Sequence, residues 1–392
     1  MTLMVSNQNL RSACNPWQAC RRHWRFRMLG IFCRLAGSLM LMALGIAGAQ
    51  AQNFVLKPFS EARAPEIAGL TAAEQSKALG RGVNFGGTLE APSEGAWGGR
   101  LSTELFAAVR QGGFQTIRLP VRFSSHAALS EPYKLDEAFM KRVDFAINNA
   151  LSRGLNIIID FHHYHEMDGD PLEAEEVAIG VEKSRERFLA IWEQLAQRYQ
   201  SLPNDKVLFE IYNEPHGKTE EVWNDLLAKA LAVIRKTNPH RFLIIDPAEW
   251  STAWGLEKLA LPPDDRRLIV TIHNYAPFKF TMQGASWIEG SRPWLGTSCC
   301  EKTQIEEIRT PLDMAVEWGK KNDRPIFVGE FGSNSLAYYP DRVTYTRITR
   351  EEIERRGMSW AYWDFASHEF GPWDPTTKSW LPELHEALVP KK

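Results

Sequence analysis

The chain has 392 residues, of which 44% are hydrophobic and 24% charged, a composition typical of a globular protein with a large buried core. Its 46 basic and 48 acidic residues nearly balance, but a basic leader holds six of the arginines, so that 40 basic residues face 48 acidic ones in the remainder, a net charge of about −8. Because polyanions are bound by basic surfaces, this charge disfavours nucleic acid as a partner.

The first 51 residues are predicted to be a secretory signal peptide. They contain six arginines and no Asp, Glu or Lys, and they lead into an apolar run over about 35–47 that is short for a bilayer span. Small residues at Ala47, Ala49 and Ala51 predict cleavage near 49–52. A start at Met28 would give a more ordinary signal length, and an uncleaved anchor is the competing interpretation. We expect no stable membrane anchor and a secreted or periplasmic protein.

A lead-in over residues 52–76 is followed by apolar runs that alternate with helical patterns, which is the sequence sign of βα units. Eight short runs are predicted as strands, over 82–85, 116–119, 156–161, 207–212, 242–246, 268–272, 326–328 and 359–363. Helices are expected between them and after the last, over 103–111, 137–153, 185–199, 219–237, 304–321, 342–356 and 381–388, with a short one after the fifth strand.

Eight such units favour a single (β/α)₈ TIM barrel over residues 77–390, in the α/β class, rather than a doubly wound sheet. No linker-like stretch rich in Ser, Gly or Pro separates a second domain, so no appended carbohydrate-binding module is expected. The longest connections run over 163–184 and 276–303, and both are expected at the face where the strands end.

Cysteine usage excludes a disulfide scaffold. Cys299 and Cys300 are the two of five cysteines that lie beyond the leader. Neighbouring cysteines rarely form an unstrained bridge, which leaves three states open: free thiols, a bridge between the two, or a bridge between chains.

Polar side chains gather at the ends of the predicted strands, where a barrel would bring them into one bowl. They are Arg118, His162, Asn213, Glu214, His273, Tyr275, Glu330 and Trp363. Strand interiors favour apolar groups, and buried charges need partners, so stability alone explains such a set poorly. The pattern favours a functional site.

Two of these residues are acids that suit glycosidase chemistry. Cleavage of a glycosidic bond by two carboxyls needs one proton donor and one ionised group that faces the anomeric carbon. Glu214 and Glu330 are the candidates, and Arg118 and Tyr275 would favour an ionised nucleophile. The negative charge of the nucleophile would in turn favour the protonated form of the neighbouring acid. Asn213 lies beside Glu214 and is a candidate to hydrogen-bond the 2-hydroxyl of the sugar.

Six short motifs follow one another in an informative order. They are Ile117-Arg118-Leu119-Pro120, Asp160-Phe161-His162-His163, Tyr212-Asn213-Glu214-Pro215, Ile272-His273-Asn274-Tyr275, Gly329-Glu330-Phe331-Gly332 and Trp360-Ala361-Tyr362-Trp363. With these motifs the chain resembles glycoside hydrolase family 5, the cellulase family of retaining barrel glycosidases, over about residues 82–388. The resemblance is greatest to endoglucanase-like bacterial members. It implies a β-glucan polysaccharide or oligosaccharide as substrate and no cofactor.

The resemblance also implies roles for the matched residues. Glu214 corresponds to the general acid/base and Glu330 to the nucleophile of a double displacement, and Trp363 would stack under the sugar bound just before the cleavage point. The remaining matched or supporting positions are Arg118, His162, His163, Asn213, His273 and Tyr275. Many relatives carry an aromatic residue where Thr88 stands, so one sugar platform is either missing here or supplied from elsewhere.

Tryptophans in predicted loops also favour a sugar ligand, because indole faces stack on pyranose rings. Trp287, in the long connection after the sixth strand, is the preferred binding candidate. The others in predicted loops are Trp250, Trp254, Trp294 and Trp373.

Two stretches raise metal hypotheses. The run His162-His163-Tyr164-His165-Glu166 resembles the way barrel hydrolases hold zinc at a strand end. Such a site would need further His and Asp ligands on later strands, but those positions carry glutamates, a tryptophan and one His that is already placed next to Tyr275. Asp168-Gly169-Asp170 suits calcium, although a solvated acidic loop explains it better. We therefore expect no metal.

The catalytic set leaves the substrate open, because loops decide it. A retaining endo-β-1,4-glucanase is the first expectation, and a β-mannanase or an exo-β-1,3-glucanase on the same scaffold is the alternative. A non-catalytic sugar-binding barrel is the alternative of another class. We expect a monomer.

Overall fold

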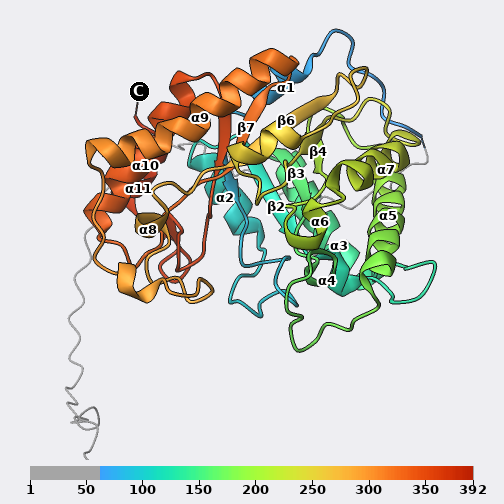
Figure 1. The fold of residues 1–392 in the computed structure, drawn as a ribbon, viewed down its shortest axis with the longest axis horizontal. Coiled ribbons are helices and arrows are strands. Elements are labelled where there is room, and N and C mark those ends of the chain that lie inside the picture. The colour runs from blue at the N-terminus through green and yellow to red at the C-terminus, as the bar shows by residue number, and fades with distance from the viewer. Residues whose placement is uncertain (1–61, 392) are drawn as a thin grey trace, which may run out of the picture. The chain divides into compact units, whose positions relative to one another are not determined.

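The computed structural model describes residues 62–391, which form a closed barrel of eight parallel strands with helices between them (Figure 1). The strands pair in chain order and β8 returns to β1, so the predicted TIM barrel is confirmed. They are β1 (Arg81–Asn84), β2 (Thr116–Val121), β3 (Asn156–Phe161), β4 (Val207–Glu210), β5 (Leu243–Ile245), β6 (Leu268–His273), β7 (Ile326–Glu330) and β8 (Ser359–Tyr362). The predicted signal peptide and its cleavage site lie outside the described residues.

The main helices fall close to the expected ranges. They are α2 (Thr103–Gln111), α3 (Glu137–Leu151), α5 (Val181–Arg198), α7 (Trp223–Arg235), α9 (Lys302–Asn322), α10 (Tyr339–Arg355) and α11 (Pro382–Leu388). The connection after β5 holds a 3-10 helix, Ala253–Lys258, where a short helix was expected. The expected helix over 219–237 is divided into α6 (Gly217–Glu220) and α7. Short helices also interrupt two long loops, as α4 (His165–Asp168) and α8 (Phe278–Thr281).

The inward-facing residues change character along each strand. Side chains alternate between the two faces of a strand, so every second residue points into the barrel. On β3 the buried inward positions are Ile158 and then Asp160, and His162 comes next. On β4 they are Leu208 and then Glu210. An apolar layer therefore fills the lower barrel, and buried polar groups lie above it, toward the strand ends.

A helix that the sequence analysis did not predict, α1 (Ala72–Leu79), begins inside the stretch taken as a lead-in. Thr71 and Glu74 form a capping box at its start, a pattern readable from the sequence. Leu79 is fully buried in the cluster of the lower barrel, together with Ala72, Ile158, Leu208, Phe242, Ile244, Ile269, Phe327 and Ala361. α1 therefore closes the N-terminal end of the barrel.

Four long connections extend from the C-terminal ends of the strands. They follow β1, β3, β6 and β8, and the last contains a small antiparallel pair, β9 (Trp373–Asp374) and β10 (Ser379–Trp380). Just before α9, Cys299 and Cys300 are bonded to each other, which selects one of the three states that the sequence left open. No helix within residues 62–391 is both long and apolar enough to cross a membrane.

We predict that Leu79→Ala lowers the free energy of unfolding by about 2–5 kcal/mol, because it empties a closed apolar layer. Urea denaturation followed by circular dichroism measures the change. Leu129→Ala is the matched control, since Leu129 is 45% exposed and its truncation should change stability by less than about 0.5 kcal/mol. Equal effects of the two substitutions would show that α1 does not close the core.

Candidate active site

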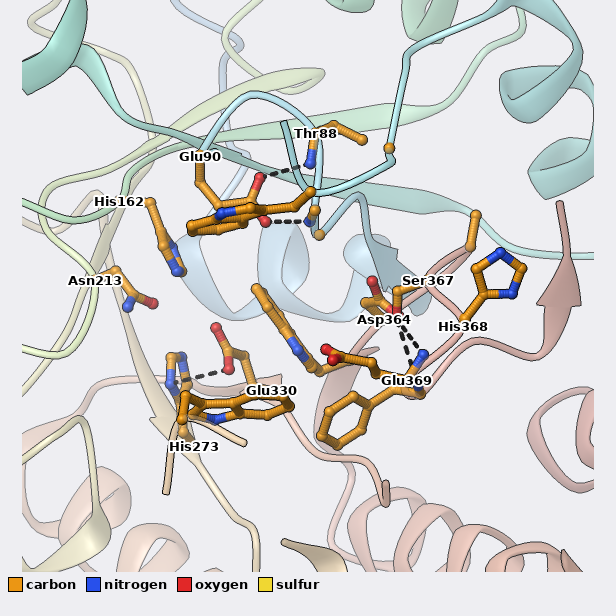
Figure 2. Close-up of a pocket in the computed structure, with 18 of the residues that line it drawn as sticks. Thr88, Glu90, His162, Asn213, His273, Glu330, Asp364, Ser367, His368 and Glu369 are labelled. Carbon is orange, nitrogen blue, oxygen red and sulfur yellow. Dashed lines mark hydrogen bonds and ion pairs between the residues drawn. The ribbon is translucent and has the colours of Figure 1, made fainter. Parts of the chain in front are cut away.

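A cleft of about 2030 Å³ lies over the C-terminal ends of the strands (Figure 2). Most of the residues proposed from the sequence line it: His162, His163, Asn213, Glu214, His273, Tyr275, Trp287, Glu330 and Trp363. Arg118 does not line the cleft, because its side chain is fully buried beneath these residues. Both long connections named in the sequence analysis contribute to the wall, as expected.

The two proposed acids face each other across the barrel. Glu330 is the last residue of β7, and Glu214 follows β4 with a positive φ of 50°, a conformation uncommon for residues other than glycine. One carboxylate oxygen of each lies within 4.8 Å of the other. Retaining glycosidases hold their two carboxyl groups about 5–5.5 Å apart, and inverting ones about 6.5–9.5 Å apart to admit water. This spacing is of the retaining kind.

Arg118 organises the layer below the acids. Its guanidinium donates two hydrogen bonds to Glu210, at 2.6 and 2.8 Å, and further ones to Glu330 and Asn213, both at 2.7 Å. Asp160 lies 3.1 Å away. One cation on β2 thus contacts acids on β3, β4 and β7. Because Arg118 donates to Oδ1 of Asn213, the amide nitrogen of Asn213 is left to donate toward the cleft.

Glu330 is held by two donors. Arg118 donates to Oε1, and the Tyr275 hydroxyl donates to Oε2 at 2.7 Å. Burial raises the pKa of Glu330, while His273, Arg118 and the Tyr275 hydrogen bond oppose the rise and Glu214 adds to it. Only the favourable contacts of Glu330 are expected from the sequence, whereas its burial, which outweighs them, arises from the fold.

Glu214 has a different environment. Burial raises its pKa to about 7, and the positive charges of Arg118 and His216 only partly oppose this. Its Oε1 lies 2.7 Å from Nδ1 of His273, whose own pKa is lowered to about 4 by burial, so that His273 is neutral near pH 7. Glu214 therefore keeps its proton to a higher pH than an ordinary glutamic acid does. When it is protonated, its repulsion of Glu330 is absent, which favours the anionic form of Glu330.

Three fully buried acids in the layer beneath the cleft were not proposed from the sequence: Asp160, Glu210 and Asp246. Asp160 lies 2.6 Å from Nδ1 of His162 and orients that ring. Asp246 accepts a hydrogen bond from Ser251 at 2.7 Å and lies 3.9 Å from Nε2 of His273. Each of the three interrupts or ends an apolar strand, and such a charge needs a buried partner. That signal was available in the sequence.

Aromatic residues line the cleft on several sides. Trp363 lies parallel to His162, with ring centroids 5.7 Å apart. Trp287 is half-exposed and lies 6.1 Å from Phe370. Of the other loop tryptophans, Trp250, Trp254 and Trp373 reach the cleft, whereas Trp294 packs against Phe278.

Thr88 is buried and donates to the backbone of Phe85, so it offers no sugar platform. Further along the same connection, Trp97 lines the cleft and is 48% exposed. Its ring lies 6.2 Å from that of His163 and 5.3 Å from the Arg122 guanidinium. Trp97 is therefore a candidate for the platform that the sequence left unplaced.

Groups with a geometry that could hold a metal occur twice within residues 62–391, as Glu214–His273–Glu330 and Glu210–Asp246–His273. Neither includes His162 or His163, the residues that raised the zinc hypothesis. Arg118 already donates to both Glu210 and Glu330, and a bound cation would have to compete with it. In the stretch considered for calcium, Asp168 accepts from Tyr212, and Asp170 lies 3.0 Å from His216.

Comparison with known proteins gives a consistent result. The family model described as Cellulase (glycosyl hydrolase family 5) matches residues 77–369. Endoglucanase H of Acetivibrio thermocellus is 33% identical over 292 residues, which cover 74% of this chain and 30% of that protein. The cellulase/esterase CelE of the same organism is 30% identical over 345 residues, which cover 82% of this chain and 40% of that protein. The chain thus spans less than half the length of these two relatives.

Solved structures match most of the chain. Thermotoga maritima Cel5A in complex with cellobiose is 44% identical, with a TM-score of 0.76 over 81% of this chain and 100% of that one. The same protein has been solved with mannotriose, with the same identity, TM-score and coverage.

The pKa of Glu214 makes a prediction about stability. In the folded state it is raised from 4.5 to about 7, so between these values the folded state binds more protons than the unfolded state, and the free energy of unfolding falls as the pH rises. Glu214→Gln removes this term. It should raise the free energy of unfolding by about 1–3 kcal/mol at pH 8 and by much less at pH 4.

Urea denaturation at the two pH values measures the difference. The exposed Glu289, changed to Gln, is the matched control and should show no such dependence on pH. A Glu214→Gln effect of the same size at both pH values would contradict the raised pKa.

Proposed function

The chain belongs to glycosyl hydrolase family 5, and on this premise we propose that it is a retaining endo-β-1,4-glucanase that hydrolyses β-glucan polysaccharides. The observation that carries the proposal is the pair Glu214 and Glu330, with carboxylate oxygens within 4.8 Å and with different partners. The hydrogen bonds from Arg118 and Tyr275 favour the anionic form of Glu330, and the raised pKa of Glu214 keeps it a proton donor.

The two acids account for a double displacement. A carboxylate oxygen of Glu330 attacks the anomeric carbon while Glu214 gives its proton to the leaving oxygen, which forms a glycosyl ester on Glu330. Glu214 then takes a proton from water, the water oxygen attacks the anomeric carbon, and Glu330 leaves as a carboxylate. Asn213 is positioned to donate to the 2-hydroxyl, and Trp363 is the candidate platform beneath the sugar.

Three observations favour a polymeric glucan. The cleft is larger than the roughly 300–1,000 Å³ of a typical small-molecule pocket. Trp97, Trp250, Trp254, Trp287, Trp363 and Trp373 line it, as expected for several stacked sugars. Both curated relatives described above carry cellulase or endoglucanase names.

β-Mannan is a second candidate substrate, because a 44% identical structure has been solved with mannotriose. Nothing found for residues 62–391 specifically favours an exo-β-1,3-glucanase. A non-catalytic sugar-binding barrel is disfavoured, since it would have no use for two closely spaced acids with divided environments.

We also propose that the protein is exported, as a secreted or periplasmic monomer without a stable anchor. The leader pattern supports this, and so does the bond between Cys299 and Cys300, because disulfides persist in oxidising compartments.

Glu330→Ala should reduce turnover by at least about 10⁴-fold, since no glycosyl ester can form. Azide should then restore activity on an activated aryl glycoside and give a glycosyl azide of inverted configuration. Glu214→Ala should keep most activity on substrates with activated leaving groups, and its azide product should have retained configuration. NMR of the two azide products distinguishes the outcomes. Exchanged configurations would reverse the assignment of the two roles.

A substrate panel tests specificity. Reducing-sugar release from barley β-glucan and carboxymethylcellulose should exceed release from laminarin by at least about tenfold, with mannan intermediate. A rapid fall in the viscosity of carboxymethylcellulose would indicate endo action. Preference for mannan would replace the glucanase assignment with a mannanase, and preference for laminarin would replace it with a β-1,3-glucanase.

A further inference from the structure

His216 lies behind the active site, between Glu214 and an exposed tryptophan. It is largely buried and comes two residues after Glu214. Its Nδ1 lies 2.6 Å from the backbone carbonyl oxygen of Glu214, and its Nε2 lies 3.0 Å from a carboxylate oxygen of Asp170. Its ring is stacked on Trp250, with centroids 3.4 Å apart and an interplanar angle of 15°. One side chain therefore connects three segments of the cleft wall.

The hydrogen-bond partners define the charge of His216. A carbonyl oxygen and a carboxylate can only accept, so both ring nitrogens carry a proton and the ring is an imidazolium. Burial opposes this charge, but the hydrogen bond to Asp170 and the nearby Asp168 outweigh it and raise the pKa of His216 to about 9. A cation stacked against an indole is attracted to its face. The stack on Trp250 is thus favourable at neutral pH.

Two of the three partners of His216, Glu214 and Trp250, have unusual backbones. Glu214 has a φ of 50°, and the three consecutive residues Glu249, Trp250 and Ser251 have φ values of 59°, 60° and 54°. Such conformations cost free energy in residues other than glycine and persist only where neighbours impose them. The Trp250 amide also donates to the carbonyl of Pro215, so the two strained segments are joined directly as well.

Trp250 is 52% exposed and lines the cleft after β5, the strand next to the β4 end that carries Glu214. His216 covers one face of its indole. A sugar stacked on Trp250 would therefore lie on the side of the cleft where Glu214 delivers its proton, which is the leaving-group side.

We propose that His216 is a positioning residue that couples the Trp250 platform to the proton donor Glu214. This inference rests on the proposed glycosidase function. Through its two hydrogen bonds and its stack, His216 holds the Glu214 backbone and the indole in one arrangement. A leaving-group sugar bound on Trp250 then has its glycosidic oxygen within reach of the acid.

The coupling makes a distinct kinetic prediction. A misplaced donor harms only substrates whose leaving group needs a proton. His216→Phe keeps an aromatic ring against Trp250 but removes both hydrogen bonds and the charge. It should lower kcat/KM for β-glucan and for phenyl β-cellobioside by about 10–100-fold. For 2,4-dinitrophenyl β-cellobioside, whose leaving group departs unprotonated, the fall should be less than about threefold.

The pH profile provides a second readout, which a merely structural role would not move. His216 lowers the pKa of Glu214, so its removal should shift the alkaline limb of kcat/KM to higher pH. The other ionisable groups around Glu214 remain in place in the variant: Arg118, Asp160, Glu210, His273, Tyr275 and Glu330.

Further variants separate the parts of the coupling. Trp250→Ala should lower kcat/KM for β-glucan, because it removes the platform for the leaving-group sugar. For β-glucan, the effects of His216→Phe and Trp250→Ala should be less than additive in the double variant.

Asp170→Asn should show the same dependence on leaving group as His216→Phe, to a smaller degree, and it supplies the test if His216→Phe does not fold. His240→Phe, at a partly exposed histidine, is the matched control and should change none of these rates.

Equal losses of His216→Phe on both aryl cellobiosides, or additive effects in the double variant, would overturn the inference and leave His216 a structural residue. Unchanged rates would overturn it as well. Failure of the wild-type protein to cleave any of these substrates would contradict the proposed glycosidase function instead, so the two failures are distinguishable.

Discussion

The buried guanidinium of Arg118 is the interaction on which the upper barrel depends. From β2 it contacts Asn84 on β1, acids on β3, β4 and β7, and the amide of Asn213. Burying one cation among several carboxyls is costly unless nearly every donor is used. Here the hydrogen bonds fix the guanidinium in one orientation, and with it the plane of the Glu330 carboxylate. The acids around the guanidinium are buried with it, and burial raises their pKa values, that of Asp160 to about 7.

The division between the two halves of the barrel follows from this cluster. Below it, the cluster formed by α1 and the inward apolar residues supplies stability. Above it, the inward-facing side chains are polar, and they serve the reaction rather than the stability of the fold. The strand ends that carry the reacting groups are therefore supported by a packed apolar layer. The loops around them form the walls of the cleft and can differ without changing the strand ends. That arrangement allows one catalytic set to serve different sugars.

Much of this was predictable from the sequence, and the failures have physical causes. Strand periodicity and order predicted the barrel, and the polar strand ends predicted which side chains would meet. Asp160, Glu210 and Asp246 were missed because they were taken as parts of apolar runs, although a lone charge in such a run requires a partner. α1 was missed because it is short, despite the Thr71–Glu74 capping signal. The net upward shift in the pKa of Glu330 depends on burial, which no residue pattern specifies. The contacts of His216 could not be predicted, because they join three loops that only the fold brings together.

The bond between Cys299 and Cys300 has a practical consequence for studies of the cleft in solution. Residues 62–391 contain no other cysteine, so this part of the folded chain offers no free thiol to a maleimide or a spin label. Two cysteines introduced together, one near Trp287 and one near Trp97, would then carry probes at two known places. Distances between such probes would report how far the walls of the cleft move when a glucan enters.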